Sequence, residues 1–369
     1  MIESVHLENF KCFTNLDIEL RNMTVFAGAN GAGKSSVIQS LLLLKQTQED
    51  KSANLSKELL LKGNYVNLVS ANAIRNFKED RADIVLAVKE AGMDYIQFKM
   101  PDMLRDEVLA HTMVEGPLDD FVSNSNLMRP DFVYLYADRQ MPQEDYDIKE
   151  RDIVGTSRLG NKQGNWTAAF LNECGNVKKI SLESMQHPQA DNQTVVANVA
   201  AWMQHIIGNG LKIKAEESPN GKRIDLSYLA KVKESEIRLS PMNVAFGNSY
   251  LLPVVVGILT APHGSLFIVE NPEAHLHPRA QVRIADLLAL AAQSGVQLIV
   301  ETHSDHFLNS LRYNVYKNRI SASDVVVYYK DTEDSAFERV DYDRNGGYLN
   351  EGFPDGFYDA SLGMLIEMQ

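Results

Sequence analysis

Apolar and polar side chains alternate over residues 5–10 and 16–20, which predicts two strands at the start of the chain. The apolar run 23–27 predicts a buried strand, and a glycine-rich turn follows it. Small polar residues and then a leucine-rich stretch, 37–45, predict a helix that begins just after this turn. The chain is therefore expected to open with three strands, a turn and a helix.

The middle of the chain is richer in predicted strands and less regular. Residues 101–130 carry weak patterning, and the polar, glycine-containing stretch 144–164 predicts a loop. Strands are expected at 81–88 and 95–100 (a hairpin), 131–137, 211–216 and 223–228, and helices at 166–173 and 194–207. This pattern favours an α+β segment.

Strands and helices alternate again in the last third. Strands are predicted at 266–269, 297–301, 324–330 and 337–341, and helices after Pro241, at 278–293 and up to about 312. Such alternation at both ends of a chain indicates an α/β sheet. Neither a 20–50-residue repeat nor a sustained heptad pattern occurs, so the chain is not a coiled-coil arm protein.

Composition narrows the class of protein. A formal net charge of −13 disfavours contact with nucleic acid unless Lys and Arg gather on one folded face, and the sequence contains no run of five basic residues. The two cysteines, Cys12 and Cys174, form neither a disulfide framework nor a metal motif. No apolar stretch approaches the ~18 residues of a membrane span, and the start lacks a signal-peptide pattern. We therefore expect a cytoplasmic protein.

The strongest motif is Gly28–Ser35, which reads GANGAGKS and fits G-x-x-x-x-G-K-[ST] at each fixed position. Glycines let backbone N–H groups face phosphate oxygens, and the following helix offers its positive end to the same anion. Lys34 is expected to reach the β- and γ-phosphates of ATP, and the Ser35 hydroxyl to bind Mg²⁺. The predicted nucleotide contacts are Asn30, Gly31, Ala32, Gly33, Lys34, Ser35 and Ser36. A chance glycine-rich turn is the alternative.

Two further strand ends carry candidate chemistry. The apolar strand that ends in Glu270 fits a Walker B pattern, in which a carboxylate lies beside the Mg²⁺ held by Ser35. The strand 297–301 leads into Thr302, His303 and Ser304, where His303 is placed to reach the γ-phosphate. The alternatives are a core strand with a solvated glutamate and an ordinary structural histidine.

The order of these motifs, with the N-terminal NFKCF of residues 9–13, resembles the RecF/SMC-type ABC ATPases. Residues 270–278, ENPEAHLHP, are similar to a block of ATPases related to the overcoming-lysogenization-defect (OLD) group. The tail, 346–348 and 353–359, resembles the C-terminal region of the DUF3696 subfamily. The resemblance covers roughly residues 1–70 and 240–360.

The resemblance implies a homodimer that sandwiches ATP between each P-loop and a signature motif of the partner. The corresponding segment, 243–250, reads NVAFGNSY instead of the usual L-S-G-G-Q, and Gly247 and Ser249 are the expected phosphate contacts. Ser249 as an ordinary helix cap is the alternative. The resemblance also places Lys11 near the phosphates; a solvated lysine is the alternative. It makes Asn67 a candidate for a metal contact.

The sequence departs from the family pattern directly after Glu270. Asn271 occupies the position of the catalytic glutamate and cannot accept a proton. Glu273 is the expected replacement if the turn brings it round; otherwise the protein is a nucleotide-gated switch with slow hydrolysis. His275 and His277, with His303 and His306, also suggest a zinc cluster, although no Cys or Asp completes a ligand set.

We therefore predict an α/β P-loop ABC-type ATPase head with a mixed sheet and an N-terminal antiparallel β subdomain. The expected parts are 1–100 with the Walker A motif, an α+β insertion 101–240 as the partner surface, and 241–369 with the signature-like, Walker B and tail segments. No acidic cluster of the Toprim nuclease type follows Ser304, so the ATPase is expected to act alone or to drive a separate effector, such as a nuclease or toxin in anti-phage defence. A RecF-like DNA-repair ATPase is the alternative.

Overall fold

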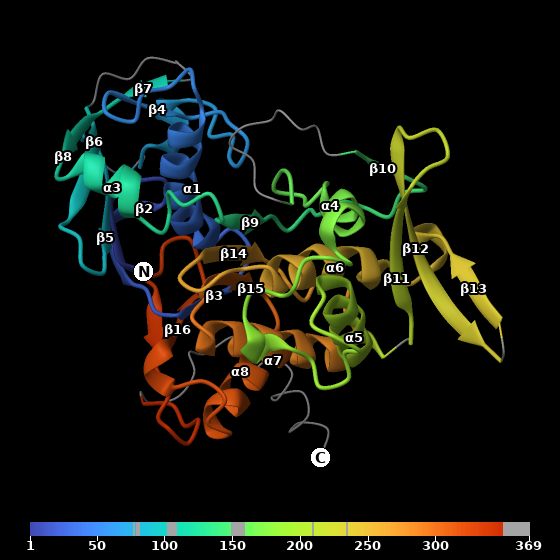
Figure 1. Cartoon of the computed structure of the whole chain (residues 1–369). Helices are drawn as coiled ribbons and strands as arrows, with labels where there is room; N and C mark the ends of the chain where they lie inside the picture. Colours follow the sequence, from blue (N-terminus) through green and yellow to red (C-terminus); the bar gives the residue numbers. More distant parts are fainter. Residues whose placement is uncertain are drawn as a thin grey trace.

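The computed structural model describes residues 1–76, 78, 82–101, 109–148, 159–208, 210–233 and 235–349. An antiparallel sheet with the strand order β2-β1-β5-β6-β8 forms the N-terminal part (Figure 1). Its strands are β1 (Ile2–Phe10), β2 (Phe13–Glu19), β5 (Ile84–Glu90), β6 (Ile96–Met100) and β8 (Met113–Glu115). The hairpins β1–β2 and β5–β6 confirm the strands predicted at both places.

A second sheet has six strands in the order β17-β16-β3-β15-β14-β9. Its members are β3 (Met23–Gly28), β9 (Val133–Leu135), β14 (Leu266–Glu270), β15 (Gln297–Thr302), β16 (Val325–Lys330) and β17 (Glu338–Val340). All neighbours pair in parallel except β16 and β17. The carboxyl ends of β3, β15 and β14 therefore meet at one edge, which is where open α/β sheets bind ligands.

Both faces of this sheet are buried, which explains the continuous apolar runs of its strands. Alternate residues of β3 show the division, because Val25 packs with one apolar cluster and Phe26 with the other. Helix α1 (Lys34–Glu49) and the N-terminal sheet contribute to the cluster around Phe26. The other face is covered by α4 (Thr167–Cys174), α5 (Val195–Ile207), α6 (Phe246–Leu259), α7 (Pro278–Gln293) and α8 (Asp305–Tyr316).

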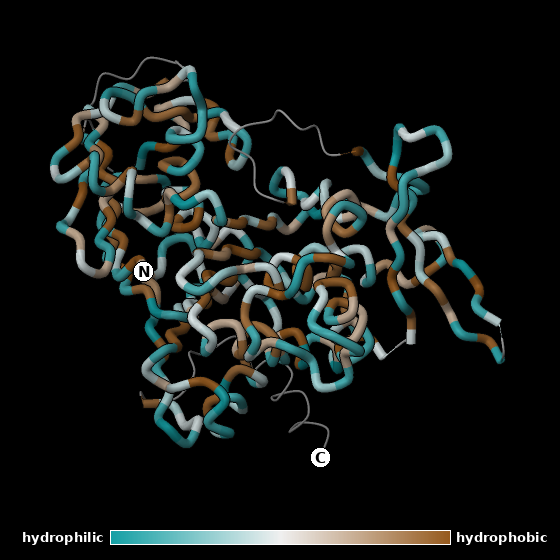
Figure 2. Tube along the Cα trace, viewed as in Figure 1, coloured by the Kyte–Doolittle hydropathy of each residue, from teal (hydrophilic) through white to brown (hydrophobic). Residues whose placement is uncertain are grey.

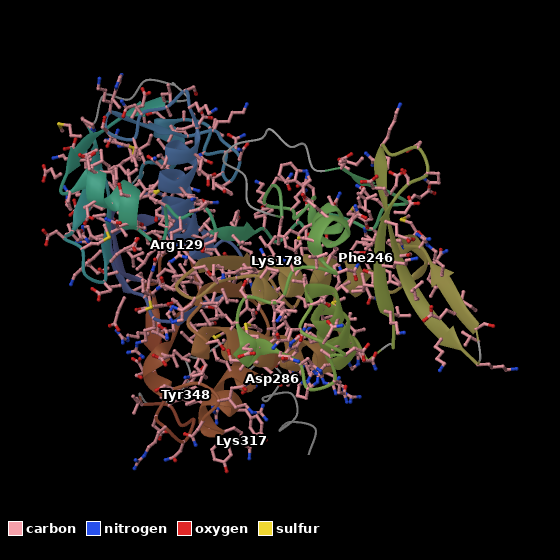
Figure 3. The ribbon with its side chains drawn as sticks, viewed as in Figure 1. Arg129, Lys178, Phe246, Asp286, Lys317 and Tyr348 are labelled. Atoms are coloured by element: carbon pink, nitrogen blue, oxygen red, sulfur yellow. The ribbon has the colours of Figure 1, made fainter. Side chains whose placement is uncertain are left out.

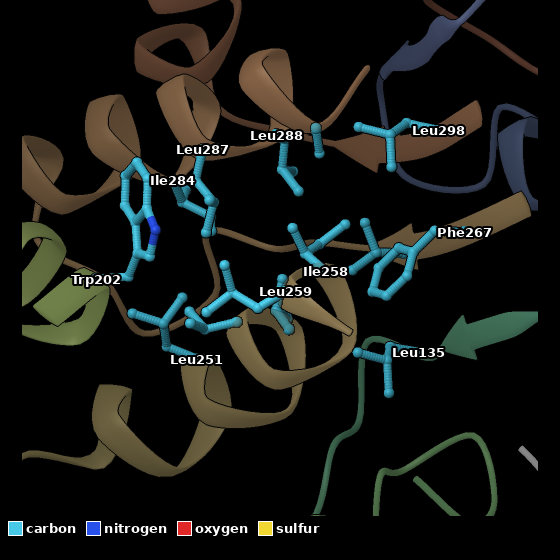
Figure 4. Packing of buried hydrophobic residues seen from close by; sticks show 14 of the residues in the cluster. Leu135, Trp202, Leu251, Ile258, Leu259, Phe267, Ile284, Leu287, Leu288 and Leu298 are labelled. Atoms are coloured by element: carbon cyan, nitrogen blue, oxygen red, sulfur yellow. The ribbon is translucent and has the colours of Figure 1, made fainter. Parts of the chain in front are cut away.

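Figure 4 shows how the second face is filled. Leu251 and Leu259 of α6, Ile284 and Leu288 of α7 and Phe267 of β14 are almost wholly inaccessible to solvent. Burial of a side chain of this size contributes about 1.5–3 kcal/mol. The core therefore fixes α6 and α7 firmly against the sheet edge that carries the candidate site.

A four-stranded sheet extends from the body beside α4 and α6 (Figure 1). It consists of β10 (Tyr146–Asp147), β11 (Lys212–Glu217), β12 (Arg223–Val232) and β13 (Ser235–Leu239). The pair β11–β12 confirms the predicted strands, whereas β13 was not predicted. Its outer part carries hydrophilic residues next to exposed apolar ones (Figure 2), among them Val232 and Ile237.

The remaining described elements are short. They are β4 (Glu58–Leu60), β7 (Leu109–His111), α2 (Ala71–Ile74), α3 (Leu118–Asn124) and the 3₁₀ turns η1 (Glu183–Met185), η2 (Pro241–Asn243) and η3 (Ala322–Asp324). Residues 353–359, which carry part of the DUF3696 resemblance, lie outside the described residues. Among the helices that the structure describes, none is long and apolar enough to span a bilayer.

The predicted fold class is confirmed: this is an α/β head with a mixed sheet and an N-terminal antiparallel sheet. The segment 101–240 contributes to more than one layer, since β9 forms the edge of the six-stranded sheet while α4 and α5 pack in the core behind it. The expected division into three parts stays a prediction.

Candidate functional site

The P-loop connects β3 to α1 at the carboxyl edge of the six-stranded sheet. Gly28 has φ 131°, and a Cβ there would lie 1.9 Å from the carbonyl oxygen of Lys330 on β16. Gly33, with φ 99°, precedes α1, and its Cβ would lie 2.4 Å from Cys12 Sγ. Neither position tolerates a side chain, so packing alone requires glycine at both.

Lys34 and Ser35 occupy the first turn of α1. Lys34 is 3% exposed, and its Nζ donates to the carbonyls of Gly28 at 3.0 Å and Ala29 at 2.6 Å. Burial lowers the Lys34 pKa, and nearby Glu301 partly opposes this. Ser35 Oγ lies 3.0 Å and 2.8 Å from the two carboxylate oxygens of Glu301. The loop thus holds an ammonium group and a hydroxyl beside a buried acid, as phosphate and metal binding require.

Two glutamates end neighbouring strands at this edge. Glu270 of β14 pairs in register with Glu301 of β15. Burial, and then the charge of Glu301, raises the Glu270 pKa to about 7, while Glu270 accepts a hydrogen bond of 2.6 Å from Tyr134 OH. Burial also raises the Glu301 pKa. The structure therefore places Glu270 at the predicted strand end, with Tyr134 rather than Ser35 as its hydroxyl partner.

The turn after β14 carries Glu273 back towards β15. Asn271 and His275 both adopt positive φ, 45° and 61°, which makes this turn sharp. Glu273 Oε1 accepts from Thr302 Oγ1 at 2.7 Å and from the His303 backbone N–H at 3.0 Å. The Glu273 Oε2 and Asn271 Oδ1 atoms are buried and have no hydrogen-bond partner among the described residues. The turn thus brings Glu273 to the tip of β15, as catalysis by this residue would require.

His303 lies at the tip of β15, immediately before the Ser304 cap of α8. Partial burial and then the charge of Lys34 lower the His303 pKa, while a hydrogen bond with the Gly28 backbone raises it. His303 is therefore a neighbour of the P-loop and suits contact with phosphate as a neutral imidazole. His275 instead packs edge-on against Phe246 and Tyr250, and His277 caps α7. No group of three or more potential His, Cys, Asp or Glu ligands gathers within the described residues.

The signature-like segment leads into α6, whose first residue is Phe246 (Figure 3). Gly247 is buried against the backbone of His275, where a Cβ would lie 2.9 Å from the His275 carbonyl oxygen. Ser249 is 7% exposed, and its buried hydroxyl lies near those of Tyr146 and Tyr228 without a well-formed hydrogen bond. The Ser249 hydroxyl thus faces the interior, which does not favour the predicted contact with a partner's phosphate.

Lys11 and Asn67 contact protein groups outside the P-loop. Lys11 donates from Nζ to Gln39 in the second turn of α1. Asn67 is exposed, and its side chain accepts from the Val69 backbone N–H at 3.2 Å. Buried Gln46 of α1 holds the neighbouring loop, donating to the Leu60 carbonyl at 2.6 Å. A nucleotide role for Lys11 and a metal role for Asn67 stay predictions.

Arg139 was not predicted as a site residue from the sequence, yet it connects α6 to the end of β14 and the turn that follows. Its guanidinium is wholly buried and donates to the carbonyls of Tyr136, Tyr250, Glu270 and Asn271 at 2.7–3.1 Å. Burial lowers its pKa to about 10. The same side chain therefore ties α6 to the turn after β14. No local sequence signal distinguishes Arg139 from a surface arginine.

A hollow of 830 Å³ lies beside the P-loop, between β2 and the segment around β17. Phe13, Phe337 and Tyr328 contribute aromatic surface, and Cys12 connects the hollow to Gly33 of the P-loop. Its lining also includes the acids Asp17, Glu19, Glu333 and Asp334, so the hollow has a mixed apolar and acidic surface.

A P-loop with Lys34 and Ser35, and acids at the ends of β14 and β15, define an ATPase head of the ABC type. Comparison with known proteins agrees with this class. The family model "AAA ATPase domain" matches residues 1–153, and the model "AAA domain, putative AbiEii toxin, Type IV TA system" matches residues 205–309. The chain is thus similar to SMC/RecF-like ABC-type ATPases and to the OLD family, as its motifs predicted.

Two characterised relatives share sequence with the chain. It is 23% identical to an OLD nuclease of Thermus scotoductus over 92% of this chain and 66% of that protein. It is 26% identical to the DNA replication and repair protein RecF of Corynebacterium jeikeium over 24% of this chain and 21% of that protein. The chain thus spans less than two thirds of either relative.

The fold has a counterpart among solved structures. An Smc head domain with an extended coiled coil, bound to the C-terminal domain of ScpA derived from Pyrococcus furiosus, gives a TM-score of 0.51 at 12% identity. The match covers 100% of this chain and 99% of that one. The likeness is one of fold.

Proposed function

We propose that the protein is a Mg²⁺-dependent ATPase that works as a homodimer with composite ATP sites. The observation that carries the proposal is the P-loop itself, where Lys34 and Ser35 face a buried carboxylate across 4.0 Å and 2.8 Å. Mg²⁺ would supply charge neutralisation at the phosphates. Ser35 and Glu270, the acid that ends β14, fit it, because Mg²⁺ prefers hydroxyl, carboxylate and phosphate oxygens.

The remaining roles in phosphate binding and hydrolysis fall to residues of the chain itself. Lys34 binds the β- and γ-phosphates, and the backbone N–H groups of residues 30–36 bind the anion at the start of α1. Glu273 orients the attacking water or accepts its proton, which its buried, unpartnered Oε2 supports. His303 contacts the γ-phosphate from the tip of β15. In this proposal Gly247 and its neighbours meet the nucleotide of the partner subunit through backbone N–H groups at the start of α6.

We further propose that nucleotide-driven closure gates a separate effector, such as a nuclease or toxin in bacterial anti-phage defence. The similarity to an OLD nuclease and to a family described with a toxin supports this role. The sheet β10–β13 is the proposed contact surface, because β13 leaves most of its side chains exposed, including Ile237 at 45%.

The decisive experiment measures ATP hydrolysis with and without Mg²⁺ for the wild type and for Lys34→Ala. Lys212→Ala is the matched control, since Lys212 lies on β11 with a side chain that is 70% exposed. We expect turnover in the wild type and the control, its loss in Lys34→Ala, and dimer formation with ATP. ATP binding without turnover would favour the nucleotide-gated switch, and absence of ATP binding would refute the proposal.

A further inference from the structure

Glu301 belongs to a strand end from which sequence reasoning selected only His303. On β15, Ile299 packs in the cluster that contains α1, and because side chains alternate along a strand, Glu301 points to that same side. The glutamate is 7% exposed and lies within hydrogen-bond distance of Ser35 Oγ through both carboxylate oxygens. An acid here is a buried charge aimed at the one hydroxyl that P-loop chemistry assigns to the metal.

We propose that Glu301 is a direct Mg²⁺ ligand beside Ser35, an inference that rests on the proposed ATPase function. The spacing of the two side chains supports this. Adjacent ligands of octahedral Mg²⁺, each about 2.1 Å from the ion, lie about 3.0 Å apart. The Ser35 Oγ to Glu301 distances are 2.8 Å and 3.0 Å. The pair is therefore already spaced as neighbouring ligands, and nucleotide phosphates would supply further oxygens.

Sheet order favours Glu301 over Glu270 for direct coordination. β15 lies between β3 and β14, so Glu301 is one strand from the P-loop strand and Glu270 is two. With strands ~4.8 Å apart, this places the Glu270 backbone about 10 Å from β3. Tyr134 of β9 also bonds the Glu270 carboxylate from the side away from β15. Of the two acids, Glu301 therefore contacts Ser35, whereas the Glu270 carboxylate has Tyr134 as its hydroxyl partner.

A structural role for Glu301 makes a different prediction. If the carboxylate only fixes Ser35 and Lys34, Glu301→Gln keeps a hydrogen bond to Ser35 and leaves the Mg²⁺ dependence of nucleotide binding unchanged. If it is a ligand, the amide substitutes poorly for a carboxylate, and nucleotide binding loses much of its response to Mg²⁺. A measurement of nucleotide binding, made without hydrolysis, therefore separates the two roles.

The test titrates fluorescent ATP into the full-length protein in EDTA and across a Mg²⁺ series, and follows Mn²⁺ binding to the nucleotide complex by paramagnetic relaxation. Glu301→Gln is expected to bind ATP as the wild type does in EDTA, with Mg²⁺ and Mn²⁺ affinity weakened by about 100-fold or more, beyond the loss typical of an outer-shell partner. Glu301→Asp, which keeps the charge, should restore part of it. Glu3→Gln, at a partly exposed carboxylate on β1, is the matched control.

The outcomes distinguish this inference from the function on which it rests. A wild type that binds no ATP would refute the ATPase proposal itself. A wild type that binds ATP with Mg²⁺, beside a Glu301→Gln protein with the same metal dependence, would overturn only the role of Glu301. Should Glu301→Gln not fold, Glu301→Asp decides, because its shorter side chain changes the contact with Ser35. Metal affinity equal to that of the wild type would then argue against coordination.

Discussion

Replacing Arg139 tests whether one buried guanidinium holds the candidate site together. The side chain is wholly buried and donates four hydrogen bonds to carbonyls of three separate segments. Each hydrogen bond contributes about 1 kcal/mol net, so the loss of all four costs about 3–5 kcal/mol. We therefore expect Arg139→Ala to lower the free energy of unfolding by about 3–5 kcal/mol, with part of the loss due to the cavity it leaves.

The comparison with Arg339 separates burial from the mere presence of ionic partners. Arg339 bonds Asp341 and Glu19, but its side chain is 35% exposed. Exposed pairs contribute about 0–1 kcal/mol, so Arg339→Ala should have a small effect. Arg139→Lys should fall between the two, because an ammonium group carries three donors and cannot reproduce the planar guanidinium fork.

Urea unfolding, followed by circular dichroism and intrinsic fluorescence, measures these differences in unfolding free energy, provided that its slope against urea concentration is the same for all variants. A second measurement, ATP affinity with Mg²⁺, reports whether the turn after β14 has moved. If Arg139→Ala and Arg339→Ala unfold within about 1 kcal/mol of each other, the network around Arg139 does not carry the stability that burial implies. Equal ATP affinity in a destabilised Arg139→Ala protein would limit its role to the fold.

The remaining predictions concern single positions. Gly28→Ala should abolish ATP binding and lower the Tm, because its Cβ would lie 1.9 Å from the Lys330 carbonyl oxygen; ATP titration and thermal melts check both. Burial raises the Glu270 pKa to about 7, so the folded protein retains a proton that the unfolded chain has lost, and this stability falls between about pH 4.5 and 7. Glu270→Gln should therefore gain about 2–3 kcal/mol over the wild type across that window in EDTA, and a pH-independent difference in unfolding free energy would contradict it. Ser249→Ala should change stability by less than about 1 kcal/mol, since the hydroxyl lacks a well-formed hydrogen bond, and turnover should persist unless Ser249 reaches the partner's phosphate.

The sequence predicted elements well where the signal was local. Helix α7 begins at Pro278 and ends at Gln293, as predicted, because His277 and proline mark its start and an apolar stripe runs along it. The P-loop was likewise recognisable, since its glycines, lysine and serine are consecutive. Strand β13 was missed for the opposite reason: its side chains are mostly exposed, so its pairing with β12 leaves no apolar pattern.

Side-chain direction could not be predicted in the same way. Gly247 and Ser249 fall at the expected position of a signature motif, but the helical phase of α6 turns the Ser249 hydroxyl towards Tyr146 and Tyr228. Arg139 is separated by 131 residues from one of the carbonyls it binds, that of Glu270. Contacts of this kind depend on tertiary packing, which residue order does not encode locally.

The roles of the two strand-end glutamates show what sheet order adds to a motif. Along the chain, Glu270 follows the P-loop first and carries the Walker B pattern, so it is the natural metal ligand. In the sheet, β15 is inserted between β3 and β14, and the later residue, Glu301, becomes the neighbour of Ser35. Because parallel strands bring their carboxyl ends to one edge whatever their order in sequence, the acid nearest the P-loop is decided by strand order. The metal role proposed for Glu301 is thus separate from the loss of the proton acceptor at Asn271, for which Glu273 is the expected replacement.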